Sequence, residues 1–309
     1  MKGKDLLSIH DLTSEEVKQI LNLAKELKAK QKAGIEHHLL KGKTLGMIFQ
    51  KSSTRTRVSF EVGMYQLGGS ALFLSGNDLQ IGRGEPIKDT ARVMSRYLDG
   101  IMIRTFNHDD VEEFAKYADI PVINGLTDLL HPCQVLTDLL TIQEYKGQNL
   151  KGLKLAYVGD GNNMVHSLMY GCAKVGMHFA VATPKGYEPN PEVTAKALED
   201  AKVTGGSILV TNDRVEAVKD ADIVYTDVWA SMGQEAEHDA RVKIFQDYQI
   251  NTELMRHAKA DAMVMHCLPA HRGEEISEEI LEKHADEIFD EAENRLHVQK
   301  AIMALTMCD

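Results

Sequence analysis

Apolar positions near the start of the chain recur with a helical period. Between residues 13 and 30 they are spaced three or four residues apart, at Val17, Ile20, Leu21, Ala24 and Leu27. This spacing predicts an amphipathic helix that buries one face. Thr13 and Glu16 stand at its start with the spacing of a capping box, which would satisfy two backbone N–H groups. We therefore expect a helix to begin just after Thr13.

After residue 43 the pattern changes to short apolar runs that alternate with longer amphipathic segments. In the first half we expect strands at 44–50, 71–75, 100–106 and 120–124, and helices at 58–67, 89–98, 109–118 and within 126–147. In the second half we expect strands at 153–160, 178–184, 207–213, 222–229 and 262–269, with helices between most of them. This alternation predicts an α/β fold with mainly parallel sheets flanked by helices.

A polar stretch at residues 146–152 separates the two series of strands. It predicts a domain boundary, with a first domain over residues 1–147 and a second over 148–291. The last segment, residues 292–309, is expected to form a helix that packs back on the first domain. Two domains of similar size predict a cleft between them. In open α/β sheets ligands bind at the carboxyl ends of the strands, so functional residues are expected there.

The composition of the 309 residues narrows the class of partner. Hydrophobic residues make up 43% of the chain, and the formal net charge is −11. An acidic protein is a poor match for nucleic acid or for an anionic membrane. No apolar run has transmembrane length, and the N-terminus lacks the apolar core of a signal peptide. The four cysteines show no CxxC spacing, so we expect free thiols, a cytoplasmic location and neither metal nor cofactor.

The sequence KSSTRTR, residues 51–57, concentrates three cationic side chains and four hydroxyls. It follows an expected strand and leads into an expected helix. Backbone N–H groups at a helix start are unpaired and favour an anion. Hydroxyls and guanidinium groups add further donors to phosphate oxygens. Capping alone explains one hydroxyl but not this whole set, so the stretch predicts a phosphate site. It is not a Walker motif, because GxxxxGK[ST] is absent.

A second glycine-containing stretch, YVGDGNNMVHS at residues 157–167, also follows an expected strand. Gly159 and Gly161 match the first two positions of the dinucleotide fingerprint, but Met164 occupies the third. No acidic residue clearly follows to bind a ribose hydroxyl. The incomplete motif argues against a nicotinamide enzyme.

Further polar residues stand at the expected ends of strands. Arg104 lies near the end of the strand 100–106, and His131 with Gln134 begins a helix. In the second half, Asp227 and Cys267 occupy corresponding positions. A lone cysteine is usually a small buried residue. Beside a carboxylate it becomes a candidate for handling an amine.

In their order and spacing, STRTR (53–57), HPCQ (131–134), DGNN (160–163), SMG (231–233) and HCLP (266–269) resemble the aspartate/ornithine carbamoyltransferase family. PKGYEP at 184–189 and EAENR at 291–295 extend the resemblance over essentially the whole chain. STRTR with HPCQ is typical of a site for carbamoyl phosphate. SMG with HCLP is typical of the ornithine branch. The resemblance implies transfer of a carbamoyl group to the δ-amine of L-ornithine, which gives citrulline and phosphate.

The resemblance implies a carbamoyl phosphate site made of Ser53, Thr54, Arg55, Thr56, Gln80, Arg104, His131, Gln134, Cys267, Leu268 and Arg295. Residues 53–56 would hold the phosphate, and Arg104 would bridge the phosphate and the carbamoyl group. His131 would point at the carbamoyl oxygen, with Gln134 on the nitrogen side. Gln80, in the loop of residues 75–86, would reach in from a neighbouring subunit of a homotrimer.

The resemblance also implies an ornithine site made of Asn163, Asp227, Ser231 and Met232. Its catalytic residues would be Arg55, Arg104, His131, Asp227 and Cys267. The family often has a cis peptide bond at the position of Leu268 and Pro269. No cofactor is implied, and the two substrates are the expected partners.

Other functions remain open at this point. A sibling transferase acting on putrescine, aspartate or an acylated ornithine would keep STRTR and HPCQ but should lack SMG. A non-catalytic binding protein built on the same fold should have lost Arg55, Arg104, His131 or Cys267, and all four are present. The sequence leaves the physiological direction of the reaction and any assembly of trimers undetermined.

Overall fold

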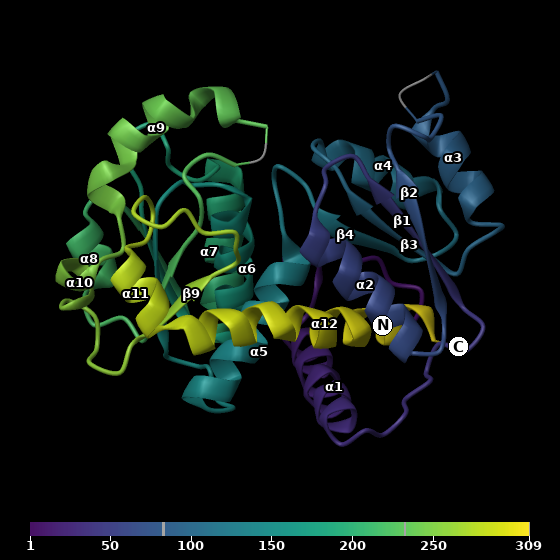
Figure 1. Cartoon of the computed structure of the whole chain (residues 1–309), viewed down its shortest axis with the longest axis horizontal. Coiled ribbons are helices and arrows are strands. Elements are labelled where there is room, and N and C mark those ends of the chain that lie inside the picture. Colours follow the sequence, from purple (N-terminus) through teal and green to yellow (C-terminus); the bar gives the residue numbers. More distant parts are fainter. Residues whose placement is uncertain (82–83, 232, 309) are drawn as a thin grey trace. The chain divides into compact units, whose positions relative to one another are not determined.

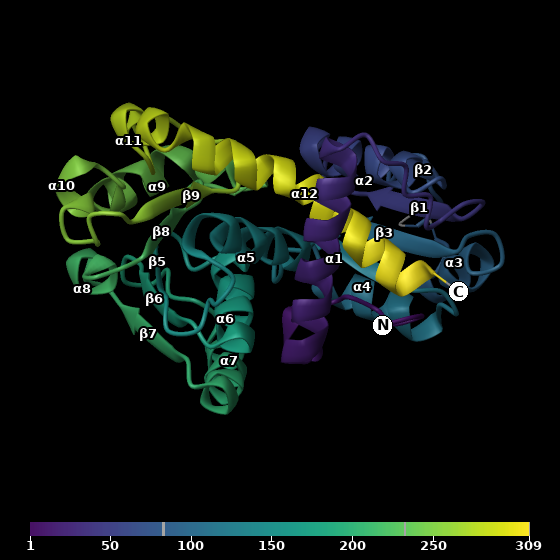
Figure 2. The same cartoon turned by 90° about the horizontal axis from the view of Figure 1, so that it is seen from below.

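The computed structural model describes residues 1–81, 84–231 and 233–308. The chain forms two compact units (Figures 1 and 2). The first contains Met1–Leu140 together with Asn294–Asp309, and the second contains Thr141–Glu293. The chain passes between them twice, within the helix α5 (Pro132–Lys146) and within the helix α12 (Ala285–Met307).

The first unit is built on a four-stranded parallel sheet with the strand order β2-β1-β3-β4. Its strands are β1 (Thr44–Phe49), β2 (Ser70–Ser75), β3 (Gly100–Arg104) and β4 (Val122–Leu126). Its other helices are η1 (Ile9–Asp11), α1 (Ser14–Lys32), α2 (Thr54–Gln66), α3 (Ile87–Met94) and α4 (His108–Tyr117). The start of α1 has the predicted capping box between Thr13 and Glu16.

Side chains from the strands and from two helices form the core of this unit. Ile48, Ile101 and Ile103 from the sheet pack with Ala91 of α3 and Phe114 of α4. A Cβ added at Gly100 of β3 would lie 2.9 Å from the sulfur of Met307. The end of α12 therefore lies close to β3. Apolar side chains of α3 and α4 therefore cover the sheet. The strands and helices of this unit alternate along the chain as predicted.

The second unit contains a five-stranded parallel sheet with the order β7-β6-β5-β8-β9. Its strands are β5 (Lys154–Val158), β6 (His178–Ala182), β7 (Ser207–Thr211), β8 (Ile223–Thr226) and β9 (Met263–His266). Its helices are α6 (Asn163–Val175), α7 (Pro191–Thr204), α8 (Arg214–Val218), η2 (Glu235–Glu237), α9 (His238–Phe245), η3 (Gln246–Tyr248), α10 (Thr252–Met255) and α11 (Glu278–Lys283). In Figure 2, α6 and α7 lie on one side of the strands β5 to β7, and α8 lies on the other.

The observed sheets agree with the predicted fold class of parallel sheets flanked by helices. Within the described residues, no helix combines the length and the apolar character needed to cross a membrane. From β5, the strands β6 and β7 are added on one side of the sheet, and β8 and β9 are added on the other. Such a switch point leaves room for a ligand at the carboxyl ends of the two strands. A ligand of this unit is therefore expected at the loops that follow β5, β8 and β9.

Candidate active site

The KSSTRTR stretch lies where β1 ends and α2 begins. Ser53 is the N-cap of α2, and its Oγ accepts a hydrogen bond from the backbone N–H of Thr56 at 3.2 Å. The backbone N–H of Gln50 donates to the carbonyl oxygen of Arg104 at 2.8 Å, which holds this loop against the end of β3. The first N–H groups of α2 thus point into the loop, and their dipole favours an anion there.

A buried network joins α2, α5 and the last helix of the first unit. Arg295 of α12 donates from Nη2 to Thr56 Oγ1 at 2.9 Å and from Nη1 to Gln134 Oε1 at 3.0 Å. Gln134 in turn donates from Nε2 to Asp138 Oδ1 at 2.8 Å. All four side chains are buried. Three of the predicted residues, far apart in sequence, are therefore joined by hydrogen bonds.

Arg104 and His131 are also buried in the first unit, each with 5% of its surface exposed. The pairing of β3 with β4 shifts register between Ile103 and Arg104, so β3 is irregular at Arg104, its last residue. Burial, together with the positive charges of Arg295 and Arg104, holds the pKa of His131 well below its ordinary value. His131 is therefore neutral at physiological pH and retains one ring N–H that can donate to an oxygen.

Two cations of KSSTRTR, the exposed Arg57 and the buried Lys51, each have a carboxylate partner. Arg57 donates from Nε to Glu61 Oε1 at 3.0 Å and stacks on the ring of Phe73 at 3.8 Å. Lys51 forms an ion pair with Asp128 and lies 4.5 Å from the centre of the Phe106 ring. Glu61 and the Phe73 ring thus engage the Nε–H and one face of the Arg57 guanidinium group.

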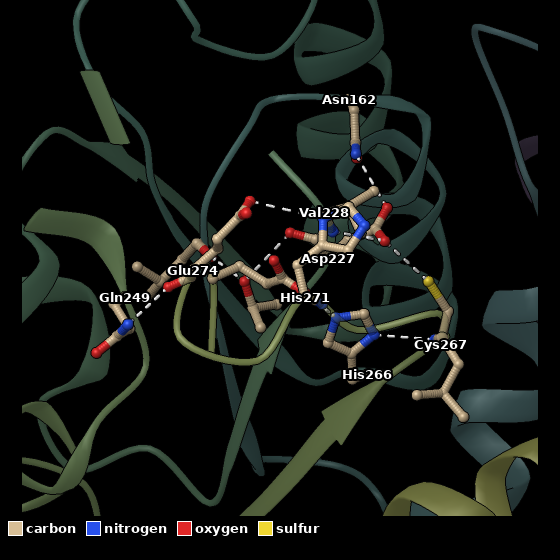
Figure 3. Close-up of polar contacts among 12 residues, drawn as sticks. Asn162, Asp227, Val228, Gln249, His266, Cys267, His271 and Glu274 are labelled. Carbon is tan, nitrogen blue, oxygen red and sulfur yellow. Dashed lines mark hydrogen bonds and ion pairs between the residues drawn. The ribbon is translucent and has the colours of Figure 1, made fainter. Parts of the chain in front are cut away.

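In the second unit, Asp227 follows β8 and Cys267 follows β9. The Cys267 thiol donates to Asp227 Oδ1 at 3.2 Å, and the backbone N–H of Val228 donates to the same oxygen at 2.8 Å (Figure 3). Asn162 donates from Nδ2 to the other oxygen, Oδ2, at 3.1 Å. The sequence places these residues together correctly, because β8 and β9 are neighbouring parallel strands.

The orientation of the Asn162 amide is fixed from its other side. Asn162 is the N-cap of α6, and its Oδ1 accepts hydrogen bonds from the backbone N–H groups of Met164 and Val165 at 3.0 and 3.4 Å. The side-chain nitrogen must therefore face Asp227. The predicted ornithine-binding residue Asn163 is the next residue and begins α6. Asn162 was missed because capping residues at helix starts are usually read as purely structural.

A fully buried pair supports the segment that carries Cys267. His266 accepts a hydrogen bond at Nδ1 from the backbone N–H of Leu268 at 2.9 Å, so its proton resides on Nε2. That Nε2 lies 2.9 Å from Glu275 Oε1, and both side chains have no exposed surface. Leu268 has a φ of 56° and is joined to Pro269 by a cis peptide bond. The turn after Cys267 is thus held in a conformation that leucine rarely adopts.

The loop after Val228 is held by a second ion pair. Arg241 of α9 donates from Nη1 to Asp160 Oδ2 at 3.1 Å and to the carbonyl oxygen of Trp229 at 3.0 Å. Burial raises the pKa of Asp160 to about 6, and Arg241 offsets only part of this shift. Ser231 is half-buried, and its backbone N–H donates to Gln234 Oε1 at 3.0 Å.

Three other residues predicted to bind carbamoyl phosphate retain exposed surface. Gln80 and Thr54 are exposed, and Arg55 is half-buried. Met232, predicted to bind ornithine, lies outside the described residues.

Both units match domains of one protein family. Residues 4–144 match the carbamoyl-P binding domain of aspartate/ornithine carbamoyltransferase, and residues 151–306 match its Asp/Orn binding domain. The chain belongs to the aspartate/ornithine carbamoyltransferase family. Among its relatives, the chain is 62% identical to an ornithine carbamoyltransferase of Carboxydothermus hydrogenoformans, over 99% of this chain and 98% of that one.

Solved structures of carbamoyltransferases are similar over the same extent. The ornithine carbamoyltransferase of Pyrococcus furiosus aligns with a TM-score of 0.95 and 57% identity, covering 99% of this chain and 97% of that chain. The enzyme of Thermus thermophilus aligns with a TM-score of 0.88 and 39% identity, covering 99% and 100%. The α/β fold predicted from the sequence is therefore the fold of this family.

In this carbamoyltransferase chain, Glu291 is a residue without a predicted role that holds the strand end next to Cys267. Glu291 accepts hydrogen bonds from the Tyr225 hydroxyl at 3.0 Å and from the backbone N–H of His266 at 3.1 Å. Together with Glu275, it fixes the strand end that carries Cys267. EAENR marked the position of Glu291 in the sequence, but only the fold shows that it faces β8 and β9.

Proposed function

We propose that this protein transfers the carbamoyl group of carbamoyl phosphate to the δ-amine of L-ornithine, forming L-citrulline and phosphate. The observation that carries the proposal is the contact of Cys267 with Asp227 at the ends of two strands. In a chain that belongs to this family, it supplies a thiol and a carboxylate for an amine substrate. The relatives at 58 to 62% identity are ornithine carbamoyltransferases, which favours ornithine over putrescine as the acceptor.

In this proposal the first unit binds carbamoyl phosphate. Ser53, Thr54 and Arg55 donate to the phosphate oxygens, and the dipole of α2 favours the anion at the start of this helix. The positive charge of Arg55 is suited to a phosphate dianion, and Gln80 of a neighbouring subunit would complete the site. Arg104 bridges the phosphate and the carbamoyl group.

The carbonyl group is polarised by Arg104, His131 and Thr56. Because its pKa is depressed, His131 is a neutral imidazole, which donates its single ring N–H to the carbonyl oxygen and has no imidazolium proton to lose. Arg295 holds the Thr56 hydroxyl and the Gln134 amide, so both groups are oriented before the substrate arrives. Each donor to the oxyanion is worth on the order of 3 kcal/mol of transition-state stabilisation.

The second unit is proposed to bind ornithine, whose δ-ammonium has an ordinary pKa of about 10.4, like that of lysine. Asp227 and Cys267 dock this amine and favour its deprotonation, while Asn163, Ser231 and Met232 hold the amino-acid end. The amine nitrogen forms a C–N bond with the carbamoyl carbon, and the C–O bond to phosphate breaks. The nitrogen loses two protons in all: Asp227 takes up the one lost before the attack, and the departing phosphate takes up the one lost after the C–N bond forms. Leu268 contributes its backbone carbonyl to the reacting group.

We further propose a cytoplasmic homotrimer as the working form of the enzyme. The acidic charge and the free cysteines fit a reducing compartment. The proposed role of Gln80 requires a neighbouring subunit, because it places this residue in the site of another chain. Sedimentation of the purified protein tests the trimer independently of activity.

The function is tested by incubating the protein with carbamoyl phosphate and, separately, ornithine, putrescine or aspartate. Phosphate and the carbamoylated product are both measured. We expect citrulline from ornithine and no product from the other amines. Product from putrescine would keep the phosphate site and overturn the choice of acceptor. Release of phosphate without any carbamoylated product would overturn the transfer reaction.

A matched pair of variants tests the phosphate site. Arg55 and Arg57 belong to the same motif, but Arg57 is paired with Glu61 on the surface. We expect Arg55→Gln to lower kcat/KM for carbamoyl phosphate by about 100-fold, because the loss of one charged donor to the substrate has an effect of this size. Arg57→Gln should remain within threefold of wild type. Equal losses in both variants would contradict the assignment of Arg55.

A further inference from the structure

Three side chains that the proposed reaction does not use meet on the surface of the second unit. They are His238, the first residue of α9, and His271 and Glu274 of the loop after β9. His238 Nε2 lies 3.0 Å from Glu274 Oε2, and His271 Nδ1 lies 3.6 Å from the same oxygen. The three ligand atoms all lie within 4.8 Å of one another. Figure 3 shows His271 and Glu274 converging beside the loop that carries Cys267.

We propose that His238, His271 and Glu274 form a binding site for a divalent transition metal ion such as Zn²⁺. Two imidazoles and a carboxylate are a ligand set that Zn²⁺ uses in proteins, and Mg²⁺ and Ca²⁺ prefer oxygen ligands alone. Zn–N and Zn–O bonds of 2.0 to 2.1 Å separate tetrahedral ligand atoms by about 3.3 Å. The two separations to Glu274 Oε2 are close to that value.

The surroundings of the cluster match those of a metal ligand set. His238 has its second ring nitrogen, Nδ1, 3.4 Å from Asp239 Oδ1. A metal-bound imidazole commonly donates its other N–H to a carboxylate, which fixes the tautomer and orients the ring. Glu274 and the two histidines retain partial exposure, so water can occupy the remaining coordination position.

The loop that carries two of the ligands is held by the protein before any ion binds. The backbone N–H of His271 donates to Glu275 Oε1 at 2.7 Å. Gln249 donates from Nε2 to the carbonyl oxygens of Gly273 and Glu274, both at 2.8 Å. An ion at this site would tie the start of α9 to the loop 271–275.

A second group of metal-ligating residues, Asp227, His266 and Cys267, also lies close together. It is a poorer candidate because both nitrogens of His266 are already engaged. Nδ1 accepts from the backbone N–H of Leu268, and Nε2 faces Glu275 in a fully buried pair. Coordination by His266 would break one of these contacts, whereas the His238 cluster needs no buried bond to be broken.

The test uses the full chain with Cys267→Ser, which removes the nearby thiol. Zn²⁺ binding is measured by calorimetry, and Co²⁺ is used as a spectroscopic probe. We expect one ion per chain and a cobalt spectrum without a thiolate charge-transfer band. His238→Asn and Glu274→Gln should each weaken binding about 100-fold, and Asp239→Asn about tenfold, as for loss of an outer carboxylate.

His257→Asn is the matched control, because His257 is exposed on the same unit and lies outside the cluster. It should bind Zn²⁺ as the Cys267→Ser parent does. The proposal is overturned if the parent binds no ion, or if His238→Asn and Glu274→Gln bind as tightly as the parent. The proposal would also be overturned if wild-type protein showed a thiolate band and Cys267→Ser lost both that band and all zinc binding. None of these readouts depends on the carbamoyl transfer reaction.

Discussion

Exchanging the two residues of the Asn162 and Asp227 pair should separate the structural role of Asp227 from its catalytic role. In Asp227→Asn, an amide nitrogen replaces one carboxylate oxygen. If it faces Asn162, two donors meet at 3.1 Å, and Asn162 cannot rotate because its oxygen caps α6. If it faces the other way, it meets the donors of Cys267 and Val228. Either orientation loses a hydrogen bond to a charged group.

The structure sets the size of each effect. Loss of one such hydrogen bond should lower the free energy of unfolding by about 2 kcal/mol in Asp227→Asn. Asn162→Asp should cost up to about 4 kcal/mol, since it brings two carboxylates together in a partly buried site. In the double variant the aspartate at position 162 can still cap α6 and can accept from the new amide. We therefore expect the double variant to be within about 1 kcal/mol of wild type.

Trp229 provides the assay, because it is the chain's single tryptophan and is buried two residues from Asp227. Its fluorescence during urea denaturation reports the unfolding of the second unit. Citrulline formation is measured on the same proteins. We expect the double variant to recover stability but to stay at least 100-fold below wild-type turnover, since the carboxylate no longer contacts Cys267. If its loss of stability equals the sum of the two single losses, the hydrogen-bond pattern inferred here is wrong.

Three other changes test separate parts of the molecule. Arg104→Ala should lower turnover at saturating carbamoyl phosphate about 100-fold, and a rate within threefold of wild type would rule out its role. Cys267→Ala should alter the ornithine KM or the pH profile more than the KM for carbamoyl phosphate, and the reverse would place the thiol on the other substrate. Burial lowers the pKa of Lys300 from 10.5 to about 8, so the unfolded chain binds more protons between these pH values. Stability measured by circular dichroism should therefore rise with pH across this window, and Lys300→Met should remove the rise. An unchanged slope in that variant would show that another group is responsible.

The Lys300 site shows a feature that sequence patterns do not reveal. Its ammonium is buried and contacts Gln31, His37 and Gln66 rather than a carboxylate, at 2.8 to 3.1 Å. In the sequence, Lys300 is a lysine on an expected helix, where a solvent-exposed position is the ordinary expectation. Its environment depends on residues more than 230 positions away.

The sequence by itself determined the alternation of strands and helices, because hydrophobic spacing depends on local geometry. It also determined which residues end strands, so Arg104, Asp227 and Cys267 could be named as candidates. Local chemistry alone predicted an anion site at the helix start at Ser53, since capping and the N–H groups of the first turn involve residues only a few positions apart.

The tertiary structure decided which of these side chains are available. Arg57 and Arg55 are equivalent in the motif, but a glutamate one turn along α2 and a phenylalanine on β2 hold Arg57 at the surface. Asn162 became a partner of Asp227 only because the order of strands brings the ends of β5 and β8 together. Hydrogen bonds and burial depend on neighbours that are distant in sequence, and the parallel sheets bring those neighbours into contact.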